Sequence, residues 1–290
     1  MFLTWKDLLT LWVPWPQIIA VLVGSGILYV RGWHRLRQRQ AFQVATGWRL
    51  ASFLGGLMAL ALAMLSAIEV LQDLLFSIHM TQHLLIMMVG APLLMLGNPY
   101  PFLVWGLPLN ARRALALVMA PQARFRRVLE RVTTPWIAWM LFVGATWLWH
   151  TPAAYDAALR SELLHVLEHI AYFATSLLFW WQVTGSAPRL RGRLGHGFRM
   201  GYLLAALAQN EILGVAIAFS PAPLYVYYTT VPRLWGVSVM NDQALGGALM
   251  WVPGGMMYVV GVIVLLARYL HEEEMRTRAE TDGLEIVHNA

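Results

Sequence analysis

The chain has 290 residues, of which 59% are hydrophobic and 12% are charged, and its formal net charge is +6. Soluble domains carry about 25% charged residues, so this composition excludes an ordinary soluble protein and indicates a membrane protein. The basic residues fall in short loops between long apolar segments, so we expect no nucleic-acid partner. Cysteine is absent, which excludes a disulfide framework and thiolate metal ligands.

Seven apolar segments are long enough to cross a hydrocarbon core of about 30 Å, which takes about 20 helical residues. We expect transmembrane helices over residues 11–30, 47–68, 76–96, 132–149, 163–183, 200–220 and 243–267. The apolar part of the fourth segment is short. The sequence therefore predicts an all-α, polytopic membrane helix bundle, with seven transmembrane helices in one domain over residues 1–270. A charged tail over residues 271–290 is expected to be a frayed helix or disordered.

The basic residues also predict an orientation. Eighteen of the 21 Lys and Arg residues fall in the loops after the first, third and fifth segments and in the tail. The opposite side of the predicted bundle receives only Lys6, Arg160 and Arg233. Because cytoplasmic loops are enriched in Lys and Arg, we expect the N-terminus outside and the C-terminus in the cytoplasm.

Proline interrupts three parts of the predicted bundle. Residues 111–132 form a basic amphipathic stretch, broken at Pro121, which we expect to lie on the cytoplasmic surface. Pro92 in the third segment and Pro253 in the seventh should kink those helices. Such breaks are tolerated in a membrane where neighbours satisfy the freed backbone groups.

Five of the nine histidines lie near the predicted outer ends of the helices. The third segment begins with the pair His79 and His83, and the fifth begins with the pair His165 and His169. Residues four apart share one face of a helix, so each pair can hold one metal ion. His150 ends the outward-running fourth segment, and Asp242 begins the seventh at the same depth.

Such a group of ionisable residues in a membrane predicts a metal or haem site. Imidazole suits zinc, copper, iron and nickel, whereas thioether sulfur selects cuprous copper. Met250 lies about two turns below Asp242, although a methionine in an apolar span more often has a packing role. With no cysteine, the sequence favours copper as Cu(I). The candidate metal ligands are His79, His83, His150, His165, His169, Asp242 and Met250.

Two carboxylates allow other interpretations. Residues 165–169 match the His-x-x-Glu-His order of inverted zinc-peptidase motifs, in which Glu168 would be a general base. Glu168 could instead orient a neighbouring imidazole. Glu211, near the middle of the sixth segment, fits either a proton or ion relay or a structural hydrogen bond.

At these same residues the sequence resembles the CtaG proteins, assembly factors of caa3-type cytochrome c oxidase. The resemblance is carried by residues 79–85 (HMTQHLL), 91–94 (APLL), 147–152 (WLWHTP), Tyr155 and Asp156, 165–169 (HVLEH), 179–181 (FWW), 223–225 (PLY), 242–247 (DQALGG) and 250–255 (MWVPGG). These blocks cover about residues 75 to 265. Thr151 departs from the leucine expected after the Trp-His dipeptide, so the partners of His150 are less well defined.

The resemblance implies a non-catalytic, multi-pass protein of the bacterial plasma (inner) membrane. Such a protein would bind copper at the outer face and deliver it to the copper centre of the oxidase. Expected partners are the cytochrome c oxidase subunits, membrane lipid and a periplasmic copper donor. Two alternatives stay open: a haem-binding electron carrier, since paired helices can supply two axial histidines, and a metal-ion transporter, motivated by Glu211 and the broken seventh helix.

Overall fold

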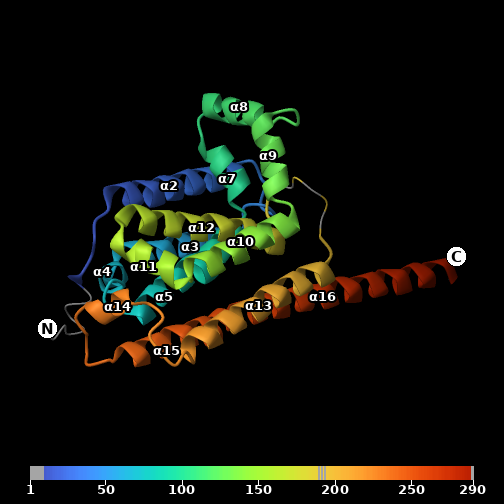
Figure 1. Cartoon of the computed structure of the whole chain (residues 1–290). Helices are drawn as coiled ribbons and strands as arrows, with labels where there is room; N and C mark the ends of the chain where they lie inside the picture. Colours follow the sequence, from blue (N-terminus) through green and yellow to red (C-terminus); the bar gives the residue numbers. More distant parts are fainter. Residues whose placement is uncertain (1–9, 189, 191, 193, 289–290) are drawn as a thin grey trace.

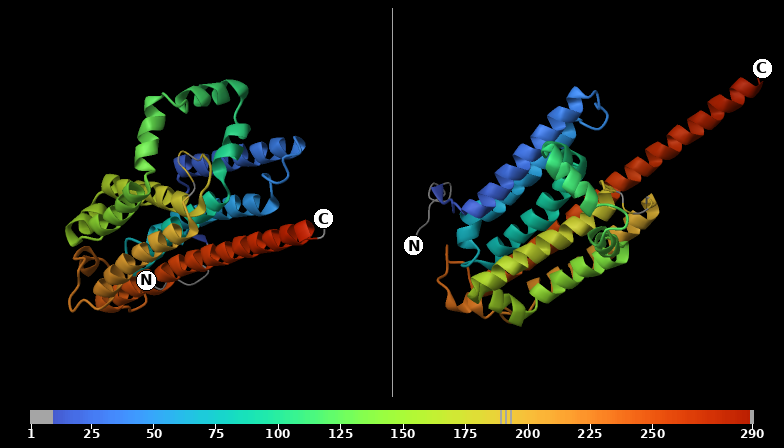
Figure 2. Two further views of the ribbon diagram at one scale, coloured as in Figure 1. Left: turned by 90° about the vertical axis from the view of Figure 1, so that its right-hand side faces the viewer. Right: turned by 90° about the horizontal axis from the view of Figure 1, so that it is seen from above.

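The computed structural model describes residues 10–188, 190, 192 and 194–288, with side chains up to residue 279. Across these residues the secondary structure is helical, with turns and loops between the helices and no strand. The long helices run side by side along one direction (Figures 1 and 2). The predicted all-α membrane bundle is thus confirmed at the level of fold class.

Six stretches of the described chain are helical, long and apolar enough to cross a membrane. They are α2 (Pro16–Gln38), α3 with α4 (Gly47–Leu65 and Ala67–Leu71), α5 with η1 and α6 (Phe76–Leu84, Leu85–Gly90 and Ala91–Leu96), α12 (Glu162–Thr184), α13 (His196–Ala218), and α15 with η2 and α16 (Val239–Leu249, Met250–Gly254 and Gly255–His288). The predicted fourth span is the shorter apolar helix α10, Pro135–Trp149, of 15 residues. A count of seven spans therefore stays a prediction that depends on α10.

The first helix differs from the predicted range at both ends. It begins at Pro16 rather than at residue 11, because the fixed φ of proline suits the first helical position. It continues to Gln38, well beyond residue 30, and carries Arg31, Arg35 and Arg37 on its last turns. Lys6, Arg189, Arg191 and Arg193, which entered the orientation argument, lie outside the described residues.

The two prolines expected to break spans lie at π-helical segments. Pro92 is the second residue of α6, just after η1, and Pro253 lies inside η2. In each segment a backbone carbonyl accepts a hydrogen bond from a neighbouring helix: Trp180 Nε1 donates to Met87 O and Asn210 Nδ2 donates to Met250 O, both at 2.9 Å. The neighbours thereby satisfy backbone groups that the irregular turns release.

Helix α5 with its continuation α6 is the most buried of the candidate spans. It packs against α3, α12 and α15, while α13 packs along α15 and α16. Helix α2 lies against α7 (Pro99–Gly106) at close range. A Cβ at Gly32 would collide with the carbonyl oxygen of Phe102, and one at Gly106 with that of Leu28. This central position of α5 matters because α5 carries His79 and His83.

Short helices occupy the two ends of the bundle. Helices α8 (Leu109–Val118) and α9 (Arg124–Val132) stand away from it (Figure 1), separated near Pro121 as predicted and with no buried residue. Their cytoplasmic location stays a prediction. At the opposite end lie α4, α11 (Pro152–Arg160) and α14 (Tyr227–Thr230).

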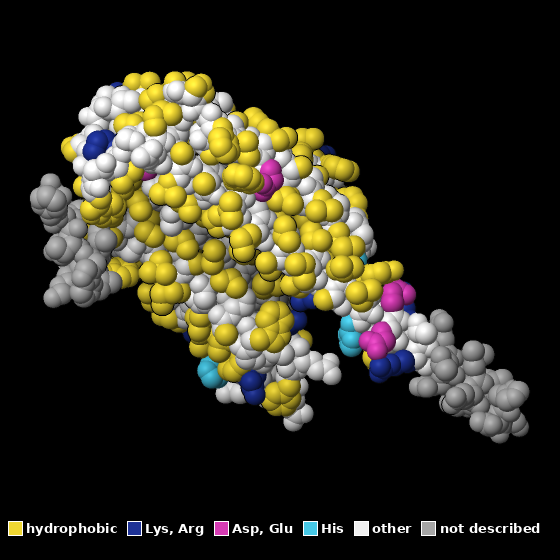
Figure 3. Space-filling model, turned by 90° about the horizontal axis from the view of Figure 1, so that it is seen from below, with side chains coloured by type: hydrophobic (Ala, Val, Ile, Leu, Met, Phe, Trp, Pro, Cys, Tyr) yellow, Lys and Arg dark blue, Asp and Glu magenta, His cyan; other side chains and the backbone are white. Residues whose placement is uncertain are grey.

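The surface of the bundle is apolar, as a lipid environment requires. Large hydrophobic side chains are more than half exposed on several helices, including Val21 on α2, Trp136 on α10 and Ile212 on α13. Figure 3 shows hydrophobic side chains covering much of one face. Helix α16 continues without a break to His288 (Figure 2), so the tail is helical as far as the structure describes it.

Candidate metal centre

Helices α5 and α12 bring the two histidine pairs together. The ring centroids of His79 and His165 are 5.3 Å apart, those of His83 and His169 are 5.5 Å apart, and each pair within its own helix is 4.3 Å apart. We call these four residues, together with Glu168, the histidine cluster. His79 is fully buried, and His83 and His169 are buried as well.

Glu168 lies inside this group of imidazoles. Its side chain is fully buried, with Oε2 4.0 Å from His79 Nε2 and Oε1 3.8 Å from His83 Nε2. Possible ligand atoms of His79, His83 and His169 lie within 4.8 Å of one another, as do those of His79, His165 and Glu168. The carboxylate therefore faces the same space as the imidazoles, where it can act as a ligand.

Most polar atoms of the cluster have no hydrogen-bond partner among the described residues. This is true of Nε2 of His79, His83, His165 and His169, of Nδ1 of His83 and of both oxygens of Glu168. An unsatisfied buried polar group costs about 1–3 kcal/mol, and more when charged. A bound cation would satisfy several of these atoms, one from each residue of a ligand group, so the residues present fit a metal ion.

His79 hydrogen-bonds two tyrosines that are distant from it in the sequence. Tyr228 O–H donates to the carbonyl oxygen of Gln72 at 2.9 Å, and the Tyr228 oxygen lies 3.2 Å from His79 Nδ1. The Tyr155 hydroxyl lies 2.8 Å from the same nitrogen. Burial raises the pKa of Tyr155 and Tyr228 well above the usual tyrosine value, so both hydroxyls keep their protons. Both contacts are made by Nδ1, so Nε2 is the ring nitrogen of His79 that faces Glu168 and the one available to a metal ion.

Helices α11 and α14 position these tyrosines. Tyr155 lies on α11 and is fully buried, and Tyr228 lies on α14. The carboxylate of Asp156 accepts from the backbone N–H of Tyr227 at 3.2 Å, which ties α14 to α11. Tyr155 and Asp156 entered the sequence argument only through the family resemblance. Tyr228 was missed, because nothing local to it signals a contact with His79.

His150 faces the cluster from the end of α10. It is the C-cap residue of that helix, and its ring centroid lies 6.4 Å from that of His83. Nδ1 lies 2.7 Å from the carbonyl oxygen of Thr146, which can only accept, so Nδ1 carries the proton. Nε2 of His150 is left with a lone pair and no partner. In His150, as in His79, Nδ1 has a hydrogen-bond partner and Nε2 is the nitrogen available to a metal ion.

Asp242 has a different environment from the one expected of a ligand. Its two oxygens accept hydrogen bonds from the backbone N–H groups of Phe76 and Ser77 at 2.9 and 3.0 Å, and from the Ser77 hydroxyl at 2.7 Å. Arg233 Nη2 lies 3.0 Å from the same carboxylate. Asp242 therefore caps the N-terminus of α5, where it fixes the helix that carries His79 and His83.

Two cavities reach the outer edge of the cluster. One, of about 370 Å³, is lined by His165 together with Glu69, Asp73 and Glu162. Burial raises the pKa of Asp73. The other, of about 450 Å³, is largely apolar, lies between α2, α3 and α12, and reaches His165 and His169. The first of these offers carboxylates along an approach to His165.

Glu211 lies away from this centre. Its carboxylate hydrogen-bonds the Trp251 side chain and lies where a Cβ on Gly255 would be. This environment matches the structural hydrogen bond that the sequence left open.

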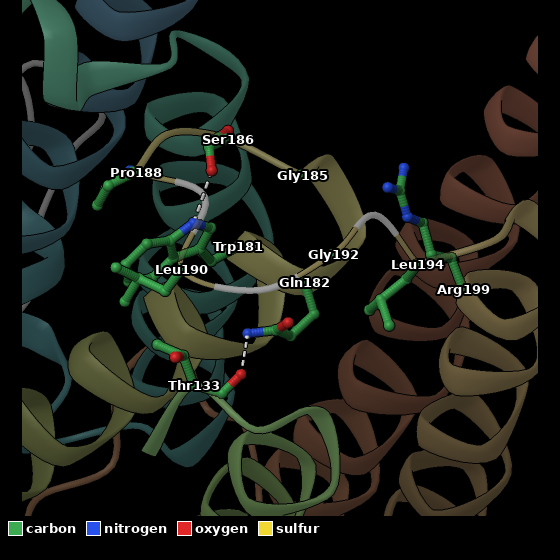
Figure 4. A pocket seen from close by; sticks show the side chains of 10 residues that line it. All are labelled: Thr133, Trp181, Gln182, Gly185, Ser186, Pro188, Leu190, Gly192, Leu194 and Arg199. Carbon is green, nitrogen blue, oxygen red and sulfur yellow. Dashed lines mark hydrogen bonds between the residues drawn. The ribbon is translucent and has the colours of Figure 1, made fainter. Parts of the chain in front are cut away.

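A further small cavity, of about 50 Å³, lies between the start of α10, the end of α12 and the loop that follows it (Figure 4). Trp181 Nε1 donates to Ser186 O at 2.7 Å, and Gln182 Nε2 donates to Thr133 O at 3.0 Å. The first bond ties the loop to α12, and the second ties α12 to the residues before α10. Both lie at the end of the bundle away from the histidines, so this cavity has a structural setting.

Comparison with known proteins agrees with the resemblance seen in the sequence. Curated proteins similar to this chain include an uncharacterized protein of Mycobacterium leprae (strain TN), 26% identical over 272 residues, and one of Mycobacterium bovis, 27% identical over 276 residues. In both cases the similarity covers 91% of this chain and 40% of the relative, so the chain spans less than half the length of these relatives. No solved structure matches. The sequence model of the family of cytochrome c oxidase caa3 assembly factors (Caa3_CtaG) matches residues 27–272, and the chain therefore belongs to this family.

Proposed function

We propose that this protein binds a copper ion in the histidine cluster and delivers it to cytochrome c oxidase during assembly of the enzyme. The observation that carries the proposal is the set of buried, unpartnered nitrogen and carboxylate atoms on α5 and α12. Family membership supplies the oxidase as the recipient. The role is non-enzymatic: the imidazoles and the carboxylate hold an ion and release it.

Ion pairing within the cluster is a weaker explanation of the same atoms. The shortest contacts between Glu168 and the imidazoles are 3.8 and 4.0 Å, which is beyond hydrogen-bond distance. A carboxylate buried at that distance from neutral imidazoles is left without compensation. A cation between them would supply the missing charge, and it would draw the ligand atoms inward by small side-chain rotations.

The donor set alone suits zinc, iron or copper. Copper is favoured because the family assembles an oxidase, and because several methionines lie beside His83. His79 and His169 are the core ligands of the proposal, with His83, His165 and Glu168 completing the set. Of the other ligands expected from the sequence, His150 and Met250 lie beyond His83, and Asp242 acts by positioning α5.

We place the protein in the bacterial plasma membrane, with α5, α12 and the cluster at the outer face. The excess of basic residues on the opposite side supports this orientation. The cavity lined by Glu69, Asp73 and Glu162 would then face the compartment from which a periplasmic donor supplies copper.

The direct test is the metal content of detergent-purified protein, compared between the wild type and His83→Ala/His169→Ala. We expect the double variant to lose copper and to fail to restore oxidase activity in a deletion strain. His34→Ala is the matched control, because His34 contacts Trp33 edge-on and away from the cluster. Equal copper in the wild type and the double variant would overturn the proposal. A Soret band in the purified protein would favour the haem-carrier alternative instead.

A further inference from the structure

A second group of possible ligands lies against His83. A cavity of about 20 Å³ is found there; its lining includes Met80, Met87, Met88, Met250, His83 and His150, but not Glu168. We call it the methionine cavity. We infer that it is a separate site for a soft monovalent cation, Cu(I), held by thioether sulfur and imidazole nitrogen.

The methionines reach this cavity from three separate elements. Met80 lies on α5, Met87 and Met88 lie on η1, and Met250 lies on η2. All four are at least 95% buried. Ordinary apolar packing does not require four flexible sulfur side chains around one small void, since leucine fills such space with better-defined rotamers.

Both π-helical segments of the described chain contribute to the lining. A π turn interrupts the regular hydrogen bonding of an α-helix and is frequently found at functional sites. The turns at Met87 and Met250 are held in place by the bonds from Trp180 and Asn210 to the carbonyl oxygens of these same methionines. The irregular backbone therefore occurs at the residues that line the cavity.

The imidazoles of the lining lack partners in the protein. Both ring nitrogens of His83 and Nε2 of His150 are buried without a hydrogen bond. Two neighbouring polar groups are engaged elsewhere: Thr146 Oγ1 donates to Phe142 O, and Asn210 Nδ2 donates to Met250 O. The buried Tyr258 hydroxyl, which also lines the cavity, has no hydrogen-bond partner among the described residues. The volume is about what one water or one small ion needs. A water would find few polar partners among thioethers, whereas a soft cation binds both donor types.

The chemistry separates this site from the histidine cluster. The cluster offers imidazole with a carboxylate, which accepts divalent ions, while the methionine cavity offers imidazole with thioether, which selects cuprous copper. The inference holds or fails independently of the proposed function, because the cavity requires no ion in the cluster. His83 borders both sites, so loading one is expected to affect the other.

X-ray absorption of the full-length, detergent-purified protein loaded with Cu(I) tests the inference. We expect sulfur scatterers in the wild type and their loss in the triple variant Met87→Leu/Met88→Leu/Met250→Leu. The same variant should lose about one bound Ag(I) per chain, with Ag(I) used as a redox-inert probe, and should keep Co(II) in the cluster. The matched control is Met58→Leu/Met64→Leu/Met95→Leu, which changes three methionines outside the cavity.

If the wild type shows only nitrogen and oxygen scatterers, the inference is wrong and the cavity holds a trapped water. This outcome does not depend on whether the triple variant folds. Unchanged Ag(I) binding in a folded triple variant would overturn it too. His169→Ala distinguishes the two proposals, since it should remove Co(II) from the cluster and leave Ag(I) with its sulfur scatterers. Loss of both ions in that variant would contradict a separate site.

Discussion

The carboxylate of Glu168 lies 3.8 Å from Nε2 of His83, fully buried and without a hydrogen bond. Three residue types meet at this point: a carboxylate on α12, an imidazole on α5 and, behind that imidazole, a group of methionines. The metal centre, the packing of the helices and their orientation can each be tested.

Changing Glu168 to Gln should weaken Co(II) or Cu(II) binding by about 100-fold, because it removes the carboxylate that lies within 4.0 Å of both His79 and His83. Competition against a chelator of known affinity measures this. Glu162→Gln, near the start of the same helix, should change affinity little. Full metal affinity together with loss of a hydrolytic activity would instead support the peptidase alternative.

Changing Tyr228 to Phe should lower metal affinity by about 10- to 100-fold while the protein stays folded. The substitution removes an oxygen that lies 3.2 Å from His79 Nδ1 and helps to hold the ring, so Nε2 is less well oriented to bind the ion. The readout is the same chelator competition, accompanied by a thermal melt. Tyr227→Phe is the control on the same helix, and an equal loss in both variants would argue against an effect through His79.

Changing Asp242 to Asn should destabilise the protein by about 2–4 kcal/mol, since it leaves Arg233 without its carboxylate and weakens the cap of α5. The melting temperature should fall while metal bound per folded molecule is retained. The opposite pattern, an unchanged melting temperature with lost metal, would make Asp242 the ligand that the sequence first suggested.

Changing Gly106 to Ala should destabilise the contact between α2 and α7 by about 1–3 kcal/mol, because a Cβ there meets the backbone of Leu28. Gly24→Ala on α2 is the matched control, with open space around the added methyl group. It should be neutral or slightly stabilising. Equal melting temperatures for the two variants would contradict the close packing of these helices.

The orientation can be tested with single cysteines, because the chain has none of its own. A membrane-impermeant thiol reagent should label Arg160→Cys in intact cells and reach Arg113→Cys only after the membrane is opened. Arg160 lies at the end of α11, and Arg113 lies on α8. The reverse labelling would invert the bundle and place the histidine cluster at the cytoplasmic face.

Local patterns in the chain suffice for the helical fold and for part of the site. Apolar segments of the right length predict spans, and His79/His83 and His165/His169 share helix faces because a helix has 3.6 residues per turn. The positions of Pro92 and Pro253 predict breaks for an equally local reason, the missing backbone N–H. The short apolar part of the fourth segment is also visible in the sequence, and α10 has 15 residues. Whether such a short helix crosses the membrane is not decided by its local sequence.

The roles of individual residues within the site depend on contacts between distant parts of the chain. Asp242 caps α5 rather than facing the imidazoles, because α15 meets the N-terminus of α5. Tyr228 contacts His79 across 149 residues of sequence, and Met250 reaches His83 only through the packing of η2. Periodicity within one helix carries no information about which neighbour a side chain meets. The histidine pairs could therefore be predicted from the sequence, whereas the position of Glu168 among the imidazoles and the methionine cavity required the packed bundle.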